Sequence, residues 1–177
     1  GQAYSVTSLG YQAFYQSTNL TSVTIPNSVT YISQYAFYQC TNLTSITVDG
    51  PNTAFSSLDG VLFNKDQTTL IQYPNGNNSQ TSYTIPNTVT NISDYAFYPA
   101  MNLTTVTFAQ GSQLEIIGNY AFWWTKLTSI EIPASVKSIG DYAFYGANKL
   151  NLITFAAGSK LQSIGLNAFN NSALLAS

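Results

Sequence analysis

The sequence contains no histidine, one cysteine and few charged residues. Without histidine, catalytic triads that use an imidazole and metal sites built on histidine are excluded. The seven acidic residues are spread along the chain without an Asp-x-Asp-x-Asp loop, so the sequence offers no calcium site. We therefore expect no enzymatic activity, no metal and no cofactor. A carboxylate pair assembled from distant parts of the chain is the one catalytic arrangement left open.

Low charge also limits the possible partners. Charged residues make up 7% of the chain, against roughly 25% in average soluble proteins. Five Lys and Arg and a net charge of -2 cannot form the basic stripe that tracks phosphates or anionic lipids. No apolar run approaches the ~18 residues of a spanning helix. We predict neither nucleic-acid binding nor membrane insertion, and the 14% aromatic content argues against disorder.

What the sequence does contain is a repeat. An Ala-Phe pair recurs every 22 to 25 residues, apart from one interval of 60 residues. The pairs are Ala13-Phe14, Ala36-Phe37, Ala96-Phe97, Ala121-Phe122, Ala143-Phe144 and Ala168-Phe169. Units this short cannot bury their own apolar face, so they are stable only when stacked on one another.

Each full unit also contains a Leu-x-x-apolar-x-apolar run, whose last apolar pair alternates as in a half-buried strand. The runs are Leu20–Ile25, Leu43–Val48, Leu103–Phe108, Leu127–Ile132 and Leu150–Phe155. Copies joined in the same direction would stack these strands into a parallel sheet. Pro26, Pro86 and Pro133 close three strands, because proline lacks the amide that continues a ladder.

The 60-residue interval departs from this pattern. Phe55–Phe63 aligns with Val29–Phe37, which predicts a degenerate copy of the repeat. Two β-rich runs, 61–64 and 69–73, flank Lys65–Thr68 and predict an inserted β-hairpin at about 61–73.

Cys40 has no partner for an internal disulfide. Its aligned positions hold Ser17, Ala100 and Ala147, so we interpret it as a small buried residue, which is how free cysteine usually behaves.

The consensus L-x-x-I-x-I-P-x-S-V-x-x-I-G-x-x-A-F is carried most fully by Leu127–Phe144 and resembles the BspA-type, or type 5, leucine-rich repeat. Asp59–Pro74 is similar to a hairpin-bearing variant in those proteins. Ser33 and Ser93 replace the glycine of the motif, and Asp49 replaces its proline.

This resemblance covers nearly the whole chain. It implies a right-handed leucine-rich-repeat solenoid with a concave parallel β-sheet and short helical or irregular convex segments. Residues 1–177 would form a single domain of six to seven repeats, as a fragment of a longer protein. The resemblance further implies a secreted or cell-surface protein that adheres to host proteins.

The outward residues of the strands are the candidate binding surface. They are Ser22, Thr24, Ser45, Thr47, Ser82, Thr84, Thr105, Thr107, Ser129, Glu131, Leu152 and Thr154. Stacked about 4.8 Å apart, they would form ladders of hydroxyls across the concave face. Such ladders can be structural, since Ser and Thr hydrogen-bond between strands, or they can form a neutral recognition surface. Glu131 and Leu152 interrupt them and are the candidate specificity residues.

Aromatic residues flank the Ala-Phe pairs. Tyr35, Tyr95, Tyr120 and Tyr142 precede them, and Tyr15, Tyr38, Tyr98, Trp123 and Tyr145 follow them. These rings either stack between copies or form an exposed patch that contacts a glycan or a protein. Trp124 should project at the edge of this column.

We therefore predict a non-enzymatic binding or adhesion module of a secreted or cell-surface protein. Its partner would be a protein, such as a host extracellular or surface protein, bound on the concave Ser/Thr face. Three alternatives stay open: a structural spacer without its own ligand, glycan binding through the aromatic column, and an ice-binding Thr array, which needs a flat face.

Overall fold

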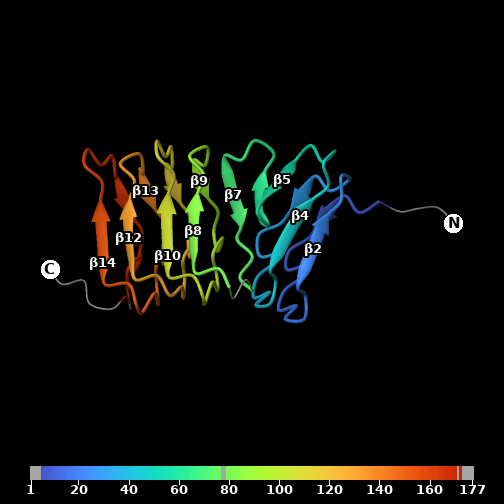
Figure 1. The fold of residues 1–177 in the computed structure, drawn as a ribbon, viewed down its shortest axis with the longest axis horizontal. Helices are drawn as coiled ribbons and strands as arrows, with labels where there is room; N and C mark the ends of the chain where they lie inside the picture. The colour runs from blue at the N-terminus through green and yellow to red at the C-terminus, as the bar shows by residue number, and fades with distance from the viewer. Residues whose placement is uncertain (1–4, 77–78, 171, 173–177) are drawn as a thin grey trace.

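The structure is a computed structural model that describes residues 5–76, 79–170 and 172. The chain forms a β-solenoid in which most repeats contribute a four-residue strand on one face and a two-residue strand on another. The long strands are β2 (Ser22–Ile25), β4 (Ser45–Val48), β8 (Ser82–Ile85), β10 (Thr105–Phe108), β12 (Ser129–Ile132) and β14 (Leu152–Phe155). They follow one another along the molecule and point in the same sense (Figure 1).

The short strands lie behind the long ones in Figure 1. They are β1 (Ser8–Leu9), β3 (Tyr31–Ile32), β9 (Asn91–Ile92), β11 (Ile116–Ile117), β13 (Ser138–Ile139) and β15 (Ser163–Ile164). Turns connect the strands, and no helix occurs among the described residues.

Neighbouring coils pair in parallel and in the predicted register. Thr24 lies opposite Thr47, Thr84 opposite Thr107, and Glu131 opposite Thr154. The inward residues of the strands and the Phe of each complete copy fill the interior, and Phe37, Phe97 and Phe122 are fully buried. The repeat alignment made from the Ala-Phe pairs is therefore confirmed.

The 60-residue interval contains an antiparallel meander of three strands, β5 (Phe55–Leu58), β6 (Val61–Asn64) and β7 (Thr69–Gln72). The predicted hairpin at 61–73 is confirmed by the pairing of β6 with β7. The predicted degenerate copy over Phe55–Phe63 is wrong. Asp59 and Gly60 both have positive φ, 52° and 79°, as in a two-residue hairpin turn, and they reverse the chain where Val29–Phe37 continues the coil.

Strand β6 separates two hydrophobic cores. Alternate side chains of a strand point to opposite faces, so Leu62 packs with the core around Phe37, whereas Val61 and Phe63 pack with the larger core around Phe97. Both cores are thus closed by the same strand. It lies in the meander between the two stacks of coils, near β5 and β7 in Figure 1.

The meander also divides the long strands into two sheets. One contains β2 and β4, and the other contains β8, β10, β12 and β14. The free edge of β4 is bound by the meander, since the Ile46 amide donates to the Gly60 carbonyl (2.8 Å) and the Val48 amide to the Ser57 hydroxyl (3.0 Å). The structure therefore differs from the single continuous sheet that the repeat pattern predicts.

A ladder of Asp and Asn side chains ties successive turns together. The Oδ1 atom of Asp94 accepts the amide of Asn119 (2.7 Å), that of Asn119 accepts the amide of Asp141 (2.7 Å), and that of Asp141 accepts the amide of Leu166 (2.6 Å). Asp94 and Asp141 share a repeat position for this structural reason.

The same ladder explains the glycine of the repeat motif. A Cβ atom on Gly118, Gly140 or Gly165 would lie 2.5 or 2.6 Å from the Oδ1 atom of the preceding copy. The same Cβ atoms would also approach main-chain atoms of the preceding copy, such as the amide nitrogen of Asn119 at 2.6 Å and that of Asp141, so main chain and side chain together require glycine here. Ser33 follows the copy that has Tyr11 at the Asp/Asn position, whereas Ser93 follows the meander, since its amide donates to the Leu70 carbonyl of β7 (2.9 Å).

We expect Gly118→Ala to lower the free energy of unfolding by about 1–3 kcal/mol, as overpacking does, because the new methyl group would collide with the Asp94 carboxylate, the Asp94 amide nitrogen and the Ile92 carbonyl. Ser93→Ala is the matched control at the same repeat position and should change it by less than about 0.5 kcal/mol. Urea denaturation measures both. Equal effects of the two substitutions would contradict the steric explanation.

Candidate binding surface

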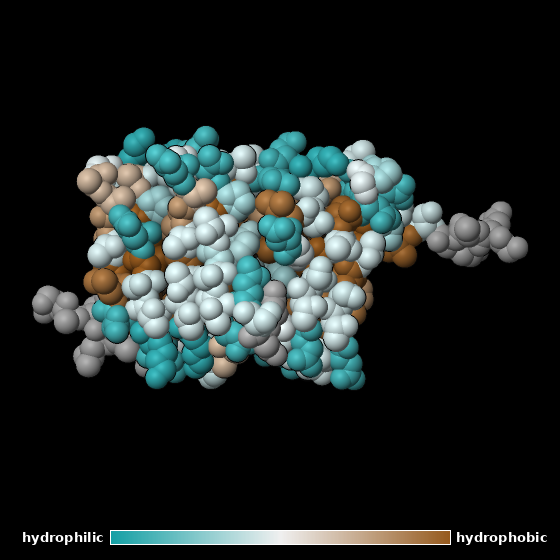
Figure 2. Space-filling model, viewed as in Figure 1, coloured by the Kyte–Doolittle hydropathy of each residue, from teal (hydrophilic) through white to brown (hydrophobic). Residues whose placement is uncertain are grey.

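The candidate binding residues of the strands lie on one face, as predicted. We call it the long-strand face, meaning the outward side chains of β2, β4, β8, β10, β12 and β14. All of these residues are exposed except Ser45, which is half-buried because the Asp59-Gly60 turn packs against it. Residues of intermediate hydropathy dominate this face, with hydrophilic turns along both of its edges and apolar surface toward the C-terminal end (Figure 2).

Hydroxyl groups on the long-strand face hydrogen-bond along the ladder. Thr24 and Thr47 are joined at 3.0 Å, and Thr84 and Thr107 at 2.9 Å. These bonds fix the rotamers of the threonines, while each hydroxyl oxygen keeps acceptor capacity for a ligand. The predicted ladder is interrupted between Thr47 and Thr84, where the meander separates the two sheets.

The long strands part between β10 and β12. Four residues pair between β8 and β10 and four between β12 and β14, whereas only Thr105 and Ser129 pair between β10 and β12. Elsewhere the residue after the strand donates its amide to the preceding copy, as Ala109 does to the Ile85 carbonyl (2.9 Å) and Ala156 to the Ile132 carbonyl (3.0 Å).

After β12 this position holds Pro133, which has no amide to donate to the Phe108 carbonyl. Pro26 and Pro86 cause no such defect, because they follow β2 and β8, and each of these strands stands at the edge of its sheet. Of the three prolines, only Pro133 ends a strand that has a strand of the preceding copy beside it in the same sheet.

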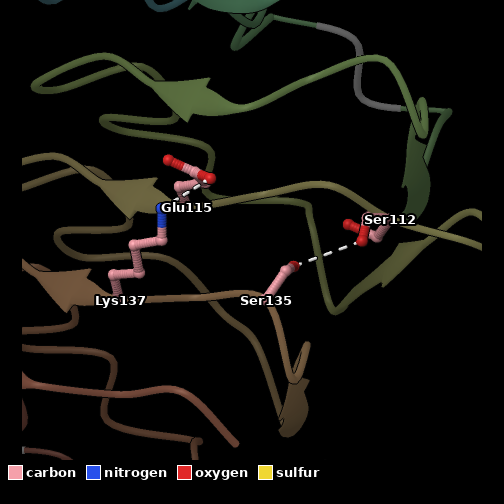
Figure 3. Close-up of polar contacts among 4 residues, drawn as sticks. All are labelled: Ser112, Glu115, Ser135 and Lys137. Carbon is pink, nitrogen blue, oxygen red and sulfur yellow. Dashed lines mark hydrogen bonds and ion pairs between the residues drawn. The ribbon is translucent and has the colours of Figure 1, made fainter.

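A groove of about 620 Å³ opens where the strands part. Its apolar lining comes from Val106, Phe108, Ile130, Pro133, Ala134 and Ala156, and Thr107 and Glu131 line it from the long-strand face. The two copies are joined at both ends of the groove. Thr105 pairs with Ser129 where the strands begin, and the Ser135 hydroxyl donates to the Ser112 carbonyl (3.2 Å) in the turns (Figure 3).

Glu131 is the only charged residue of the long-strand face. It is exposed, and no described residue hydrogen-bonds to its carboxylate or forms an ion pair with it. Glu115, in contrast, accepts from the Lys137 ammonium at 2.7 Å on the neighbouring copy (Figure 3). Leu152, the other predicted specificity residue, is 54% exposed and lies opposite Ser129.

The aromatic residues beside the Ala-Phe pairs stack into a column. Ring centroids lie 4.8 Å apart for Tyr35 and Tyr95, 4.7 Å for Tyr95 and Tyr120, and 4.9 Å for Tyr120 and Tyr142. These tyrosines have positive φ, which is unusual for a bulky residue. The contact between Tyr35 and Tyr95 carries the column past the meander, so the stacked interpretation is confirmed.

Trp124 projects at the edge of this column, as predicted, and is 52% exposed. Its indole lies against Gly146 of the next copy, where a Cβ atom would approach Cδ1 to 2.6 Å. Trp123 packs edge-on against it at 6.5 Å and stacks on Tyr98 at 4.4 Å. The ring of Trp124 is therefore held in place while half of its surface remains open to a ligand.

The other candidate groups have structural surroundings. Cys40 is buried, its thiol lies 3.0 Å from the Phe14 carbonyl, and burial raises its pKa. Within the described ranges no three His, Cys, Asp or Glu residues are grouped so that they could bind a metal. A helix long and apolar enough to cross a membrane is likewise not found in the described part of the chain.

Sequence reasoning missed the groove and the first strand of the meander. The Asp59-Gly60 dipeptide is a strong hairpin signal, and reading it would have placed β5 opposite β6. For the groove, the signal is Pro133. It ends a strand that lies one ordinary repeat spacing after the strand of the preceding copy.

The repeat pattern and the coil geometry match a known family of proteins. The model of the BspA type leucine rich repeat region matches six copies, over residues 3–83 and 68–177. The chain belongs to the BspA-type leucine-rich repeat family.

Solved structures share the fold of this BspA-type chain. The pneumococcal vaccine antigen PcpA is 34% identical with a TM-score of 0.78, over 86% of this chain and 37% of PcpA. A leucine-rich repeat protein from Eubacterium ventriosum is 29% identical with a TM-score of 0.75, over 90% of this chain and 45% of that protein. A leucine rich cell surface protein from Faecalibacterium prausnitzii is 26% identical with a TM-score of 0.51, over 86% of this chain and 52% of that protein.

This BspA-type chain therefore spans between 37% and 52% of the length of these three proteins. A search of curated proteins finds no match to it.

Several phenols of the BspA-type chain have raised pKa values. Burial is the largest cause for Tyr38, Tyr83 and Tyr95, and neighbouring phenols add to it in each case. Their folded pKa values therefore lie above the ordinary value of 10.0, which the unfolded chain retains. As the pH rises past that value, the unfolded chain loses phenol protons before the folded one does, and unfolding becomes more favourable.

We expect the stability of the chain to be constant at neutral pH and to fall above about pH 10. Tyr95→Phe keeps the ring in the stack and should reduce this fall. Urea denaturation at a series of pH values, with tyrosinate absorbance as a second readout, measures the effect. A fall of equal size in the wild-type chain and in Tyr95→Phe would contradict the assignment to Tyr95.

Proposed function

We propose that this chain is a non-enzymatic binding module whose long-strand face recognises a protein partner. The observation that carries the proposal is this exposed face of neutral side chains, held in register by strand pairing and by the threonine hydrogen bonds, with a groove in it. Solenoids commonly use such extended surfaces for binding, and leucine-rich repeats generally mediate interactions between proteins.

The descriptions of two relatives support an extracellular or surface location for the protein that contains this chain. PcpA is described as a pneumococcal vaccine antigen, and the Faecalibacterium prausnitzii relative as a cell surface protein. We propose that this chain likewise belongs to a secreted or cell-surface protein, and that its partner is a host extracellular or surface protein.

The runner-up is a structural spacer that holds other domains apart and has no ligand. It differs from the first proposal in predicting that no partner depends on the long-strand face. An ice-binding array is disfavoured, because it needs a flat and regular face and the meander interrupts the threonine ladder.

We expect the triple variant Thr84→Lys, Thr107→Lys, Glu131→Lys to lose binding to a partner purified from extracellular matrix or mucosal surface proteins. All three side chains are exposed, so the melting temperature should hardly change. Surface plasmon resonance and thermal unfolding are the two measurements.

The control for this variant is Asp49→Lys, Gln110→Lys, Asn148→Lys. It changes the net charge by the same amount at exposed residues outside the long-strand face. If the triple variant of Thr84, Thr107 and Glu131 binds the partner as well as the wild-type chain does, recognition through the long-strand face is excluded. This holds whatever the control variant shows.

Glycan binding is the second candidate, favoured by the half-exposed indole of Trp124 on its glycine platform. Flat indole faces supply contact area at low entropic cost. It predicts that some member of a sugar panel changes the tryptophan fluorescence in a saturable way, and that Trp124→Ala abolishes the change. A flat titration against the whole panel would remove this candidate.

A further inference from the structure

We propose that the groove between β10 and β12 receives a basic side chain, arginine or lysine, that the protein partner presents. This inference rests on the proposed function and specifies the chemistry of the partner at one place on the long-strand face.

The carboxylate of Glu131 gives the groove its charge preference. It is the only charged group of the long-strand face, and among the described residues it has no cation and no hydrogen-bond donor. Lys137, the lysine of the same copy, is already paired with Glu115 (Figure 3). A cation brought by a partner would therefore meet an unshared carboxylate, and charge-assisted hydrogen bonds are among the stronger polar contacts.

The other polar groups of the groove also favour a donor. Pro133 cannot donate to the Phe108 carbonyl as Ala109 and Ala156 donate to theirs, so this carbonyl of a groove-lining residue lacks the usual donor. The Thr107 oxygen adds a further acceptor. Guanidinium and ammonium groups carry donors only, whereas the Thr105 and Ser129 hydroxyls of the lining can donate or accept. The Glu131 carboxylate, which only accepts, therefore decides in favour of a cation.

The walls of the groove suit the stem of such a side chain. Phe108, Ile130 and Pro133 present apolar surface to it, and Lys and Arg bury their methylene chains along apolar surface while the charged head stays polar. The volume of about 620 Å³ falls in the range of about 300–1,000 Å³ of ligand pockets. It is sufficient for one basic side chain and part of the peptide that carries it.

The groove is also preformed. Strand pairing at Thr105 and Ser129 and the hydrogen bond from Ser135 to Ser112 join its two walls at opposite ends. Binding therefore requires little ordering of the protein, which lowers the entropic cost of association.

Acetylated, amidated Gly-X-Gly tripeptides test the inference, with X as arginine, lysine or norleucine, the uncharged analogue of lysine. Amide NMR shifts of Thr107, Phe108 and Glu131 are followed during titration. We expect saturable shifts with arginine and lysine that weaken severalfold in Glu131→Gln and in high salt. Glu115→Gln, the matched loss of a carboxylate outside the groove, should leave them unchanged. Equal shifts with norleucine, or no saturable shift with any peptide, would overturn the proposal.

Pro133→Ala provides a second test, since alanine at this repeat position donates its amide in two other copies. We expect the new amide at residue 133 to be protected from hydrogen exchange, the strands to close and the peptide shifts to disappear. An unchanged peptide response in a variant whose strands have closed would overturn the proposal.

The purified partner separates this inference from the proposed function. If the triple lysine variant loses the partner and Glu131→Gln does not, recognition through the face stands and the basic side chain in the groove is refuted. If the triple lysine variant keeps the partner, recognition through the face itself is refuted, whatever the tripeptides show.

Discussion

Each coil of this protein is fixed to its neighbours by a ladder of main-chain hydrogen bonds at equivalent positions. Where this ladder is complete the strands form a sheet, and where it is interrupted the meander or the groove occurs. Complete pairing holds β8 to β10 and β12 to β14. At β4 the meander replaces the next coil and satisfies the edge amides. At Pro133 the amide that would continue the ladder is missing, and β10 and β12 pair only at Thr105 and Ser129. The candidate groove is therefore a local defect in an otherwise periodic structure.

Periodicity is also what made the fold predictable. The Ala-Phe pairs and the alternating strand residues sufficed to assign the register, the inward residues and the outward face. Each assignment recurs in several copies of the repeat, so the copies support one another. The meander was only partly predicted. An alignment with the repeat favoured one more coil over Phe55–Phe63, while two consecutive residues, Asp59 and Gly60, favoured reversal, and the local turn chemistry prevailed.

The candidate site was predictable in its position but not in its shape. Alternation along the strands identifies Thr107 and Glu131 as outward residues, and composition identifies Glu131 as the only charge among them. Whether two neighbouring strands stay together depends on individual hydrogen bonds between copies. Pro26, Pro86 and Pro133 have similar local sequences. The sheet order shows that only Pro133 has a strand of the preceding copy beside it in its sheet, and the ordinary repeat spacing before it is the one trace of this in the sequence.

The coupling of Gly118, Gly140 and Gly165 to the Asp or Asn of the copy before them implies that the copies are not interchangeable. Serine at the glycine position fits behind the copy of Tyr11 or behind the meander strand β7, but its Cβ atom would collide with Asp94, Asn119 or Asp141. Duplication or recombination of units in such a gene would therefore succeed only between compatible junctions. The contacts between neighbouring repeats therefore restrict which repeat can follow which.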